Sequence, residues 1–165
     1  MVLTGNAWKF GDGISTDHII PGRYYHLRSN LQQLAKHVME DADPGFASSV
    51  ARGDFVVAGR NFGQGSSREH APLVIKMAGV SAVIAKSVAR IFFRNAINIG
   101  LPVLLCDTDS ICTGDRLKVD LSLGEIVNLT RRNSIKIQPP PDVMLKILAD
   151  GGLVDHVKKH GGYAL

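Results

Sequence analysis

Residues 55–70 read FVVAGRNFGQGSSREH. The apolar run at 55–58 is short and continuous, which is typical of a strand that is buried on both faces of a sheet. A glycine-rich loop follows at 59–65, and the composition of residues 68–78 predicts a helix that ends at the next glycine. The segment therefore predicts a strand, a loop and a helix in succession, as in the first half of a parallel α/β unit.

The same pattern continues along the next part of the chain. Residues 80–85 predict a second strand, 88–97 a second helix and 101–105 a third strand. Three strands and two helices within about fifty residues imply right-handed crossovers and a parallel sheet. Three short segments joined by tight turns then predict antiparallel strands, at 115–119, 125–129 and 134–137. The expected fold class is α/β, with a small parallel βαβαβ core plus antiparallel strands.

The flanking regions are less regular. We expect a strand near 7–10, a turn-rich stretch at 11–18, and a helix over 30–40 with apolar residues at helical spacing. A last helix is expected at 142–149, followed by two glycines and a polar tail. A chain of 165 residues suits one domain, so a single domain over 1–165 is predicted.

Composition excludes several classes of protein. Forty-five percent of the residues are apolar and 21% are charged, so a disordered chain is excluded. The net charge is only +4, and the longest basic runs are the pairs Arg131-Arg132 and Lys158-Lys159. A nucleic-acid partner is therefore not expected, because such proteins gather basic residues on one face. No apolar stretch is long enough to span a membrane, so a membrane partner is not expected either.

The cysteines and histidines bear on metals and on location. Cys106 and Cys112 are the two cysteines, too few to hold an iron–sulfur cluster or a structural zinc alone. The start of the chain lacks the basic and apolar regions of a signal peptide, so a cytoplasmic protein with reduced thiols is expected. We expect no metal site among the six scattered histidines, and we expect His37, His156 and His160 to be solvated.

The loop at 59–70 allows a structural and a chemical interpretation. It lacks the lysine of a phosphate-binding loop, the third glycine of a dinucleotide fingerprint and the second glycine of a hydrolase elbow. The structural interpretation is a capping box over 66–69, with Ser66 as N-cap and Glu69 at the third helical position, worth about 1 kcal/mol to the helix. The chemical one is that N–H donors at the helix start would stabilise an alkoxide of Ser66, while Arg68 holds a carboxylate.

Three motifs in order identify a family resemblance. The stretch GSSREH at 65–70 resembles the swivelling domain of the aconitase superfamily. Residues 11–21, GDGISTDHIIP, are similar to the opening motif of that domain, and residues 89–102, ARIFFRNAINIGLP, to its third motif. The resemblance implies a β/β/α swivelling fold that caps a separate large subunit. That subunit would carry a 4Fe-4S cluster, and the reaction would be dehydration and rehydration of a small hydroxy-polycarboxylate.

The resemblance also implies roles for individual residues. Ser66 matches the base that removes the carbon-bound proton, and Arg68 matches the arginine that holds a substrate carboxylate. Ser67 lies between them and is taken as a further substrate contact. Three residues would support the site: Asp17, His18 and Gly65. No metal is expected on this chain.

Substrate choice is expected to depend on residues 24–29, YYHLRS. In the family an apolar residue here suits an isopropyl group, and an arginine such as Arg28 suits an additional carboxylate. The alternative is a solvated arginine ahead of a helix whose N-cap is Ser29 or Asn30. Two further hypotheses stay open for the whole chain: a module that senses dicarboxylates without catalysis, and a purely structural cap.

Overall fold

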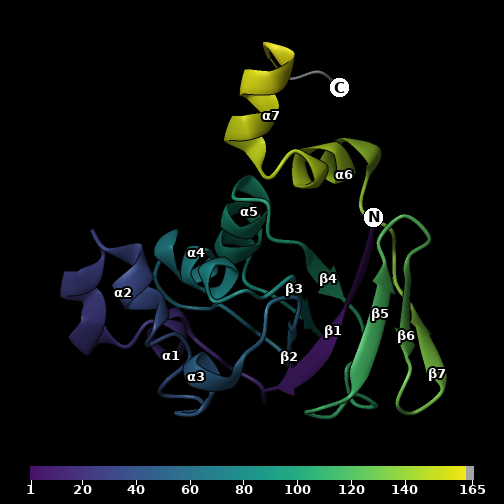
Figure 1. Cartoon of the computed structure of the whole chain (residues 1–165), viewed down its shortest axis with the longest axis horizontal. Coiled ribbons are helices and arrows are strands. Elements are labelled where there is room, and N and C mark those ends of the chain that lie inside the picture. The colour runs from purple at the N-terminus through teal and green to yellow at the C-terminus, as the bar shows by residue number, and fades with distance from the viewer. Residues whose placement is uncertain (163–165) are drawn as a thin grey trace.

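A computed structural model describes residues 1–162 of this chain, and its strands form one seven-stranded sheet in the order β4-β3-β2-β1-β5-β6-β7 (Figure 1). Strands β1 to β4 run parallel: β1 Val2–Lys9, β2 Phe55–Ala58, β3 Ala82–Ala85 and β4 Val103–Leu105. The remaining strands are antiparallel: β5 Arg116–Asp120, β6 Glu125–Asn128 and β7 Asn133–Lys136. The predicted fold class, a parallel βαβαβ core plus antiparallel strands, is confirmed.

Strand β1 joins the two halves of the sheet. It is longer than the strand expected near 7–10, since it begins at Val2. Its last residues pair in parallel with β2, as in Ala7 with Phe55, while its first residues pair antiparallel with β5, as in Val2 with Asp120. The parallel ladder therefore has one strand more than the three of the predicted core.

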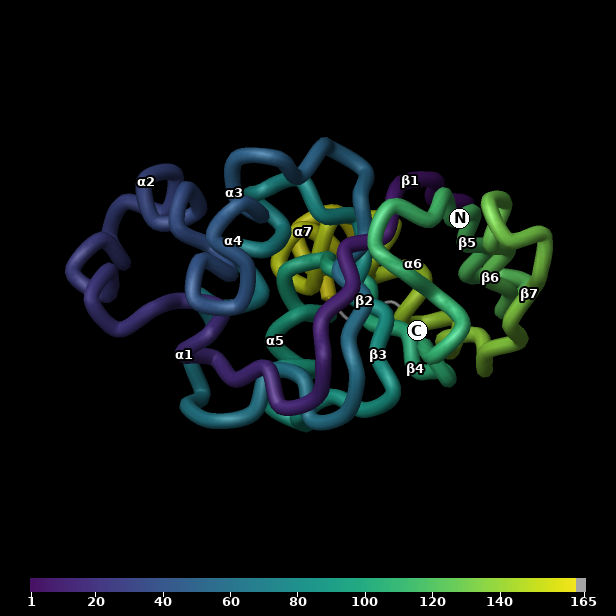
Figure 2. The backbone as a smooth tube through the Cα atoms, turned by 90° about the horizontal axis from the view of Figure 1, so that it is seen from below, coloured from purple at the N-terminus to yellow at the C-terminus, as the bar shows by residue number. Residues whose placement is uncertain are grey.

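The helices α1 to α5 lie on one side of the parallel strands, and β5 to β7 lie on the other (Figure 2). Helices α4 and α5 are the two crossovers, His70–Met77 and Arg90–Asn98. Four short elements connect β1 to β2: α1 Thr16–Ile19, the 3₁₀ helix η1 Gly22–Leu27, α2 Leu31–Ala35 and α3 Phe46–Ser49. Two helices end the described chain: α6 Asp142–Ala149 and α7 Leu153–His160.

Both faces of the parallel strands are buried, which explains the continuous apolar run at 55–58. One face packs against α4 and α5 through alternate residues of β2 and β3: Val56, Ala58, Val83 and Ala85. The other face packs against the antiparallel strands through the intervening residues: Phe55, Val57, Ala82 and Ile84. Strands β2 and β3 are thus packed on both faces, and the loop that follows β2 begins at the end of a fully buried strand.

The helix expected over 30–40 is shorter than predicted. Helix α2 ends at Ala35 because the chain then turns back, with Met39 at φ +60° and its N–H on the carbonyl of Ile19 at 3.0 Å. Val38 is still buried. The apolar spacing therefore predicted correctly which residues are buried, but it overestimated the length of the helix.

The expectation of a polar tail after residue 152 is wrong, because this segment forms helix α7. This helix projects away from the sheet beyond α5 and α6 (Figure 1). Its residue His156, expected to be solvated, is only 1% exposed. The polar composition of the segment did not indicate a helix, because only one face of α7 is buried and the rest is exposed.

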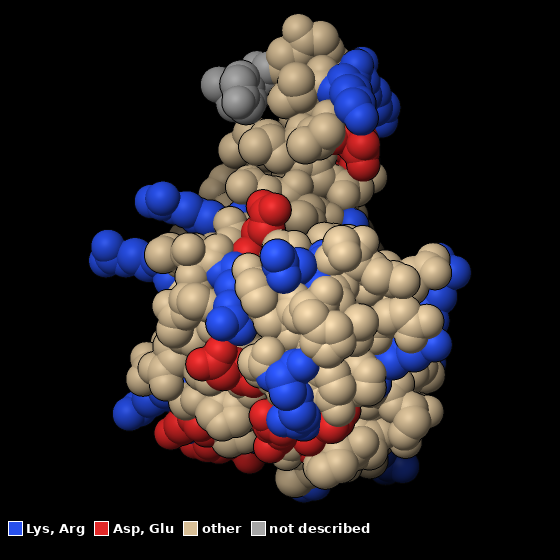
Figure 3. Space-filling view, turned by 90° about the vertical axis from the view of Figure 1, so that its left-hand side faces the viewer, with Lys and Arg blue, Asp and Glu red and all other residues tan. Residues whose placement is uncertain are grey.

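Charged residues are mixed over the surface that carries α2. In this view of the described residues, Lys and Arg are interspersed with Asp and Glu over the body of the molecule (Figure 3). Within residues 1–162, no helix has the length and apolar character needed to cross a membrane.

Candidate active site

The first two sequence motifs meet where β1 and β2 end. The opening loop after β1 runs beside the loop that follows β2, and residues Ser15 and Gln64 form a parallel bridge. Three backbone hydrogen bonds of 2.7–2.8 Å join the loops: Gly13 N to Arg60 O, Gly63 N to Ile14 O, and Thr16 N to Gln64 O. Residues about fifty positions apart in the sequence are therefore held in a fixed register.

The third motif supports the same loop from the start of α5. The N–H of Ala89 donates to the carbonyl of Phe62 at 2.9 Å. Gly63 lies at φ +73°, and a Cβ there would come within 2.4 Å of the Phe92 ring. A glycine is required at this position because the loop lies directly on that ring. The three motifs thus converge on one edge of the sheet.

Ser66 is exposed at this edge, and its hydroxyl lies against a buried threonine. Its Oγ is 3.1 Å from Thr16 Oγ1, and its backbone N–H donates to the same Oγ1 at 3.1 Å. Because Thr16 Oγ1 accepts that N–H, its own proton is available to donate to Ser66 Oγ. Gly65, at φ +114°, allows this approach, since a Cβ there would lie 3.0 Å from Thr16 Oγ1.

The capping box expected over 66–69 is wrong. Helix α4 begins at His70, and its N-cap residue Glu69 makes no side-chain capping bond. Ser66 lies in the loop ahead of the helix because Gly63 and Gly65 hold that loop in left-handed conformations. The argument that helix N–H groups surround Ser66 Oγ fails with it, and the hydroxyl that contacts Ser66 Oγ is that of Thr16.

A capping box does exist, at the start of α1. Ser15 Oγ accepts from the N–H of His18 at 3.3 Å, and the N–H of Ser15 donates to His18 Nδ1 at 3.0 Å. The side chain of His18 therefore fixes the first turn of α1. That turn carries Thr16 and Asp17 toward the loop at 66–68, so His18 acts on the site through the backbone.

Arg68 is held by two neighbours. Its Nη1 donates to Asp17 Oδ1 at 3.1 Å, and its Cζ lies 4.8 Å from the ring centre of Tyr25. The Arg68 side chain is 26% exposed, against 73% for Asp17, so Asp17 orients a partly covered guanidinium. Ser67 is exposed between Ser66 and Arg68.

Tyr25 also contacts Arg28. The Arg28 Cζ lies 4.9 Å from the Tyr25 ring centre, so both guanidinium groups rest on one aromatic ring. Arg28 is exposed, and its Nη1 also reaches the carbonyl of Tyr25 at 3.4 Å. The helix that follows has Asn30 as its N-cap, which is one of the two N-cap residues, Ser29 and Asn30, expected from the sequence. Tyr25 was not singled out from the sequence, and neither was Thr16.

Element η1, which carries Tyr25 and Arg28, is anchored by a polar cluster. Arg23 pairs with Glu40 at 2.9 Å, and Tyr24 donates to the same Glu40 oxygen at 2.9 Å. His37 stacks on Tyr24 with ring centres 3.7 Å apart, and it is half-buried rather than solvated as expected. Hydrogen bonds from His37, then from Arg23 and Tyr24, lower the pKa of Glu40 to about 2. Glu40 is therefore a carboxylate at neutral pH, and it keeps η1 in place.

The residues of this chain do not fit an iron–sulfur cluster. Such clusters need several thiolates, and the sequence has two cysteines. Cys112 is exposed, whereas burial, assisted by the nearby Asp107 carboxylate, raises the pKa of Cys106 to about 11. Cys106 is thus protonated at neutral pH, and no step of the chemistry on this chain is assigned to a cluster.

Comparison with known proteins identifies the family of this chain. Residues 10–107 match the Aconitase C-terminal domain family. The chain is 70% identical over 161 residues to 3-isopropylmalate dehydratase small subunit 2 of Archaeoglobus fulgidus, covering 98% of each. It is 56% identical to the methanogen homoaconitase small subunit of Methanothermobacter thermautotrophicus, covering 96% of this chain and 92% of that one.

A solved structure is similar over almost the whole molecule. The crystal structure of 3-isopropylmalate dehydratase from Methanocaldococcus jannaschii superposes with a TM-score of 0.92 at 49% identity, covering 98% of this chain and 96% of that one. The family match spans more than half of the sequence and includes all three motifs that meet at Ser66. The chain therefore belongs to the aconitase family, as a member built on its C-terminal domain.

Proposed function

We propose that this chain, as one domain, is the small subunit of a two-subunit hydro-lyase of the 3-isopropylmalate dehydratase type. Such an enzyme interconverts 2- and 3-isopropylmalate by dehydration and rehydration, a step of leucine biosynthesis. The observation that carries the proposal is Ser66: an exposed hydroxyl without a capping role, hydrogen-bonded to the buried Thr16 hydroxyl and two residues ahead of Arg68. The names of relatives that match over nearly their full length support the same function.

The chemistry assigned to this chain is removal of a carbon-bound proton. Ser66 Oγ would take the proton, and the hydroxyl of Thr16 would stabilise the charge that Ser66 must carry beforehand. Negative charge then develops toward the neighbouring carboxylate of the substrate, where Arg68 would bind it more strongly in the transition state. Asp17 occupies Nη1 of Arg68, which leaves the other N–H groups of the guanidinium for that carboxylate.

A partner is needed to exclude water. Ser66 and Ser67 are both exposed on this chain, and a serine base requires a pKa far below its value in water. We therefore place the complete site at the contact with a large subunit, which would also hold the iron–sulfur cluster that this chain cannot bind. A cytoplasmic location is part of the proposal and rests on the two free thiols.

A homoaconitase-type activity is the second candidate, because of Arg28. Its guanidinium lies on the same ring as that of Arg68, so the two could bind two carboxylates of one substrate. An isopropyl group enclosed beside Arg28 would leave that guanidinium unpaired, at a cost of about 1–3 kcal/mol. The methanogen homoaconitase relative shows that this activity is named within the family at similar identity.

The test is reconstitution with a cluster-bearing large subunit. We expect no turnover by this chain alone and turnover of isopropylmalate by the complex. Turnover by this chain without iron would contradict the proposal. Dicarboxylate binding by this chain alone, unaffected by Ser66→Ala, would instead indicate a sensing module.

Substrate choice is tested by kcat/KM for isopropylmalate and for a homocitrate-type acid, with and without Arg28→Val. If Arg28 binds a carboxylate, the substitution lowers kcat/KM for the tricarboxylate by about tenfold or more and spares isopropylmalate. Arg52→Val is the control, because Arg52 is exposed ahead of β2, at the opposite end of that strand from the loop. An equal effect of both substitutions would remove Arg28 from the substrate site.

A further inference from the structure

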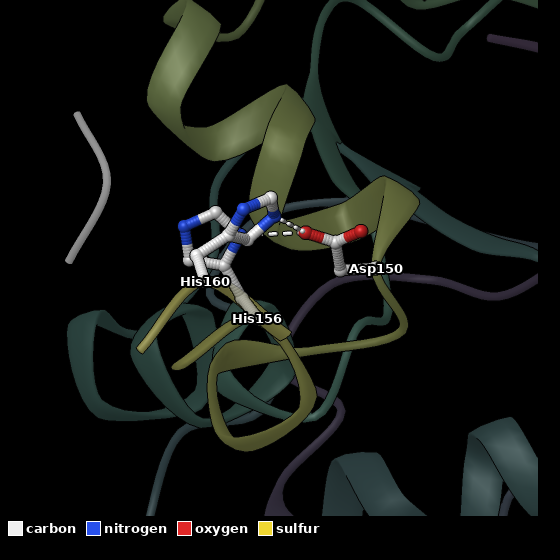
Figure 4. A group of neighbouring side chains, drawn as sticks. All are labelled: Asp150, His156 and His160. Atoms are coloured by element: carbon white, nitrogen blue, oxygen red, sulfur yellow. Dashed lines mark hydrogen bonds and ion pairs between the residues drawn. The ribbon is translucent and has the colours of Figure 1, made fainter. Parts of the chain in front are cut away.

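A second group of polar side chains lies at the joint between α6 and α7, on elements that do not carry the Ser66 site. Asp150 caps the C-terminus of α6, and Gly151 and Gly152 turn the chain into α7 with φ of +93° and +137°. His156 and His160 follow one turn apart on α7, so their side chains share one face of the helix. The turn directs that face at Asp150 (Figure 4).

Both imidazoles converge on one carboxylate oxygen. His156 Nδ1 lies 2.7 Å from Asp150 Oδ2, and His160 Nε2 lies 2.9 Å from the same oxygen. Lys159 occupies the other oxygen, Oδ1, at 2.5 Å. Oδ2 is thereby left to the histidines, and the carboxylate is presented to them through a single oxygen.

Burial gives the group a covered and an open side. The side chains of Asp150 and His156 are 7% and 2% exposed, whereas that of His160 is 36% exposed. The cluster lines a surface pocket together with Lys146, Ala149 and Lys159. Two of the three groups are thus held rigidly by the protein, and the third faces solvent, from which an ion and a water ligand could enter.

Only one of the two ring nitrogens of His156 has a hydrogen-bond partner within the described residues. Its Nε2 is buried and has no hydrogen-bond partner among residues 1–162. An imidazole binds a metal ion through one nitrogen, and Nδ1 is the nitrogen of His156 that faces the carboxylate. Among these residues the ring makes its hydrogen bond through Nδ1 to Asp150 Oδ2, so Nδ1 is the atom placed to bind a metal.

We propose that Asp150, His156 and His160 form a binding site for one divalent transition-metal ion, which clamps α7 to α6. The three ligand atoms lie within 4.8 Å of one another. Two imidazole nitrogens and one carboxylate oxygen are a ligand set that suits zinc, with water completing the tetrahedron. On binding, His156 Nδ1 and His160 Nε2 give up the protons that they donate to Oδ2, and each proton passes to the other nitrogen of its ring or to solvent, while Lys159 remains on Oδ1.

The histidine spacing was visible in the sequence, but the metal site was not expected from it. His156 and His160 are four residues apart, which places two imidazoles on one helix face. The missing signal was the helix itself, because the segment after Gly152 was taken as a polar tail. The carboxylate comes from another helix, which periodicity within α7 could not indicate.

The test is zinc binding by the full chain in the absence of the large subunit. Titration against a chromophoric zinc chelator should give one Zn²⁺ per chain with a Kd of about 10 μM or tighter. His160→Ala should weaken binding at least about tenfold, since it removes a ligand, and it is exposed enough to leave folding intact. Co²⁺ should give the d–d absorption of a low-coordinate nitrogen and oxygen site, which His160→Ala should abolish.

Two control variants separate this site from other zinc ligands. His37→Ala removes a histidine whose Nδ1 also contacts a carboxylate, Glu40 Oε2 at 2.8 Å, but which belongs to no group of three potential metal ligands among residues 1–162. Cys112→Ser removes the exposed thiol. Both variants should bind zinc as the unaltered chain does. Loss of binding in Cys112→Ser, or unchanged binding in His160→Ala, would overturn the proposal.

Thermal unfolding gives a measurement that does not depend on spectroscopy. Zn²⁺ at 100 times its Kd should stabilise the chain, and a chelator should reverse the effect. The rise in Tm should be absent in His160→Ala. A Kd for zinc weaker than about 10 μM overturns the site, whatever the outcome of the reconstitution with a large subunit.

Discussion

Two serines occupy similar positions in the sequence and behave in opposite ways. Ser15 and Ser66 each precede a helix and have a polar residue three positions later, His18 and Glu69. Ser15 caps its helix, and His18 returns a bond to the backbone of Ser15. Ser66 caps nothing, and its hydroxyl turns toward Thr16, a residue of the helix that Ser15 caps.

The difference shows a position, Ser66, where the local preference for a helix cap is not satisfied and the side chain contacts the candidate site instead. A capping oxygen is committed to backbone N–H groups, so it is not available for other chemistry. Helix α4 starts without a side-chain cap, which forgoes about 1 kcal/mol that the sequence could have supplied from Ser66. Departures of this kind from local preference are expected at functional positions. Each of the following predictions tests one side of this contrast.

The largest effect is expected from Ser66→Ala. Loss of a general base should lower kcat of the reconstituted complex by about 10²–10⁴-fold. The free energy of unfolding of this chain should change by less than about 0.5 kcal/mol, because Ser66 is exposed and caps no helix. Steady-state turnover and urea unfolding check the two halves. A variant that keeps its rate but loses about 1 kcal/mol would restore the capping interpretation.

Arg68→Lys should have the next largest effect. Lysine keeps the charge but cannot bind a carboxylate through two N–H groups while also pairing with Asp17, so kcat/KM should fall by about 30- to 100-fold. Lys118→Arg, on β5 in the antiparallel half of the sheet, is a control for the reverse exchange and should leave kcat/KM unchanged. An Arg68→Lys complex with unaltered kcat/KM would mean that Arg68 does not contact substrate.

Much of the fold was predictable because the relevant interactions are local or periodic. The apolar run of β2 gave its bounds, 55–58, since both of its faces are buried. The bounds of α6 also agree with prediction, because Pro141 precedes the helix and two glycines follow it. Helix α2 was predicted too long, since apolar spacing reports which residues are buried and not where the backbone turns.

The candidate site was only partly predictable for a related reason. Motifs identified Ser66, Arg68 and Asp17, which the structure brings to one edge of the sheet. Thr16 and Tyr25 were missed because their importance lies in contacts with residues distant in the sequence. No spacing rule connects a threonine after β1 to a serine after β2; the parallel pairing of the two strands does so.

Substitution of Thr16 tests whether the hydroxyl that contacts Ser66 Oγ contributes to the rate. Thr16→Ala removes the hydroxyl beside Ser66 Oγ and should lower kcat about tenfold, which corresponds to loss of one hydrogen bond. Thr16→Ser keeps the hydroxyl and should restore most of the rate. Because Thr16 is buried, both variants should also be compared by urea unfolding. Equal loss of rate in the two would indicate a packing role for the methyl group.

Ser15→Ala should have the smallest effect on turnover. It removes the cap of α1, so the free energy of unfolding should fall by about 1 kcal/mol, which urea titration at constant m-value would measure. Turnover should fall by no more than about threefold at saturating substrate, because the backbone bonds to the loop at 59–65 still hold Thr16 in place. Ser15→Asp, which can also cap, should recover the lost stability. Should Ser15→Ala reduce turnover as strongly as Ser66→Ala does, the capped serine would belong to the chemistry, and the division of roles between the two serines would fail.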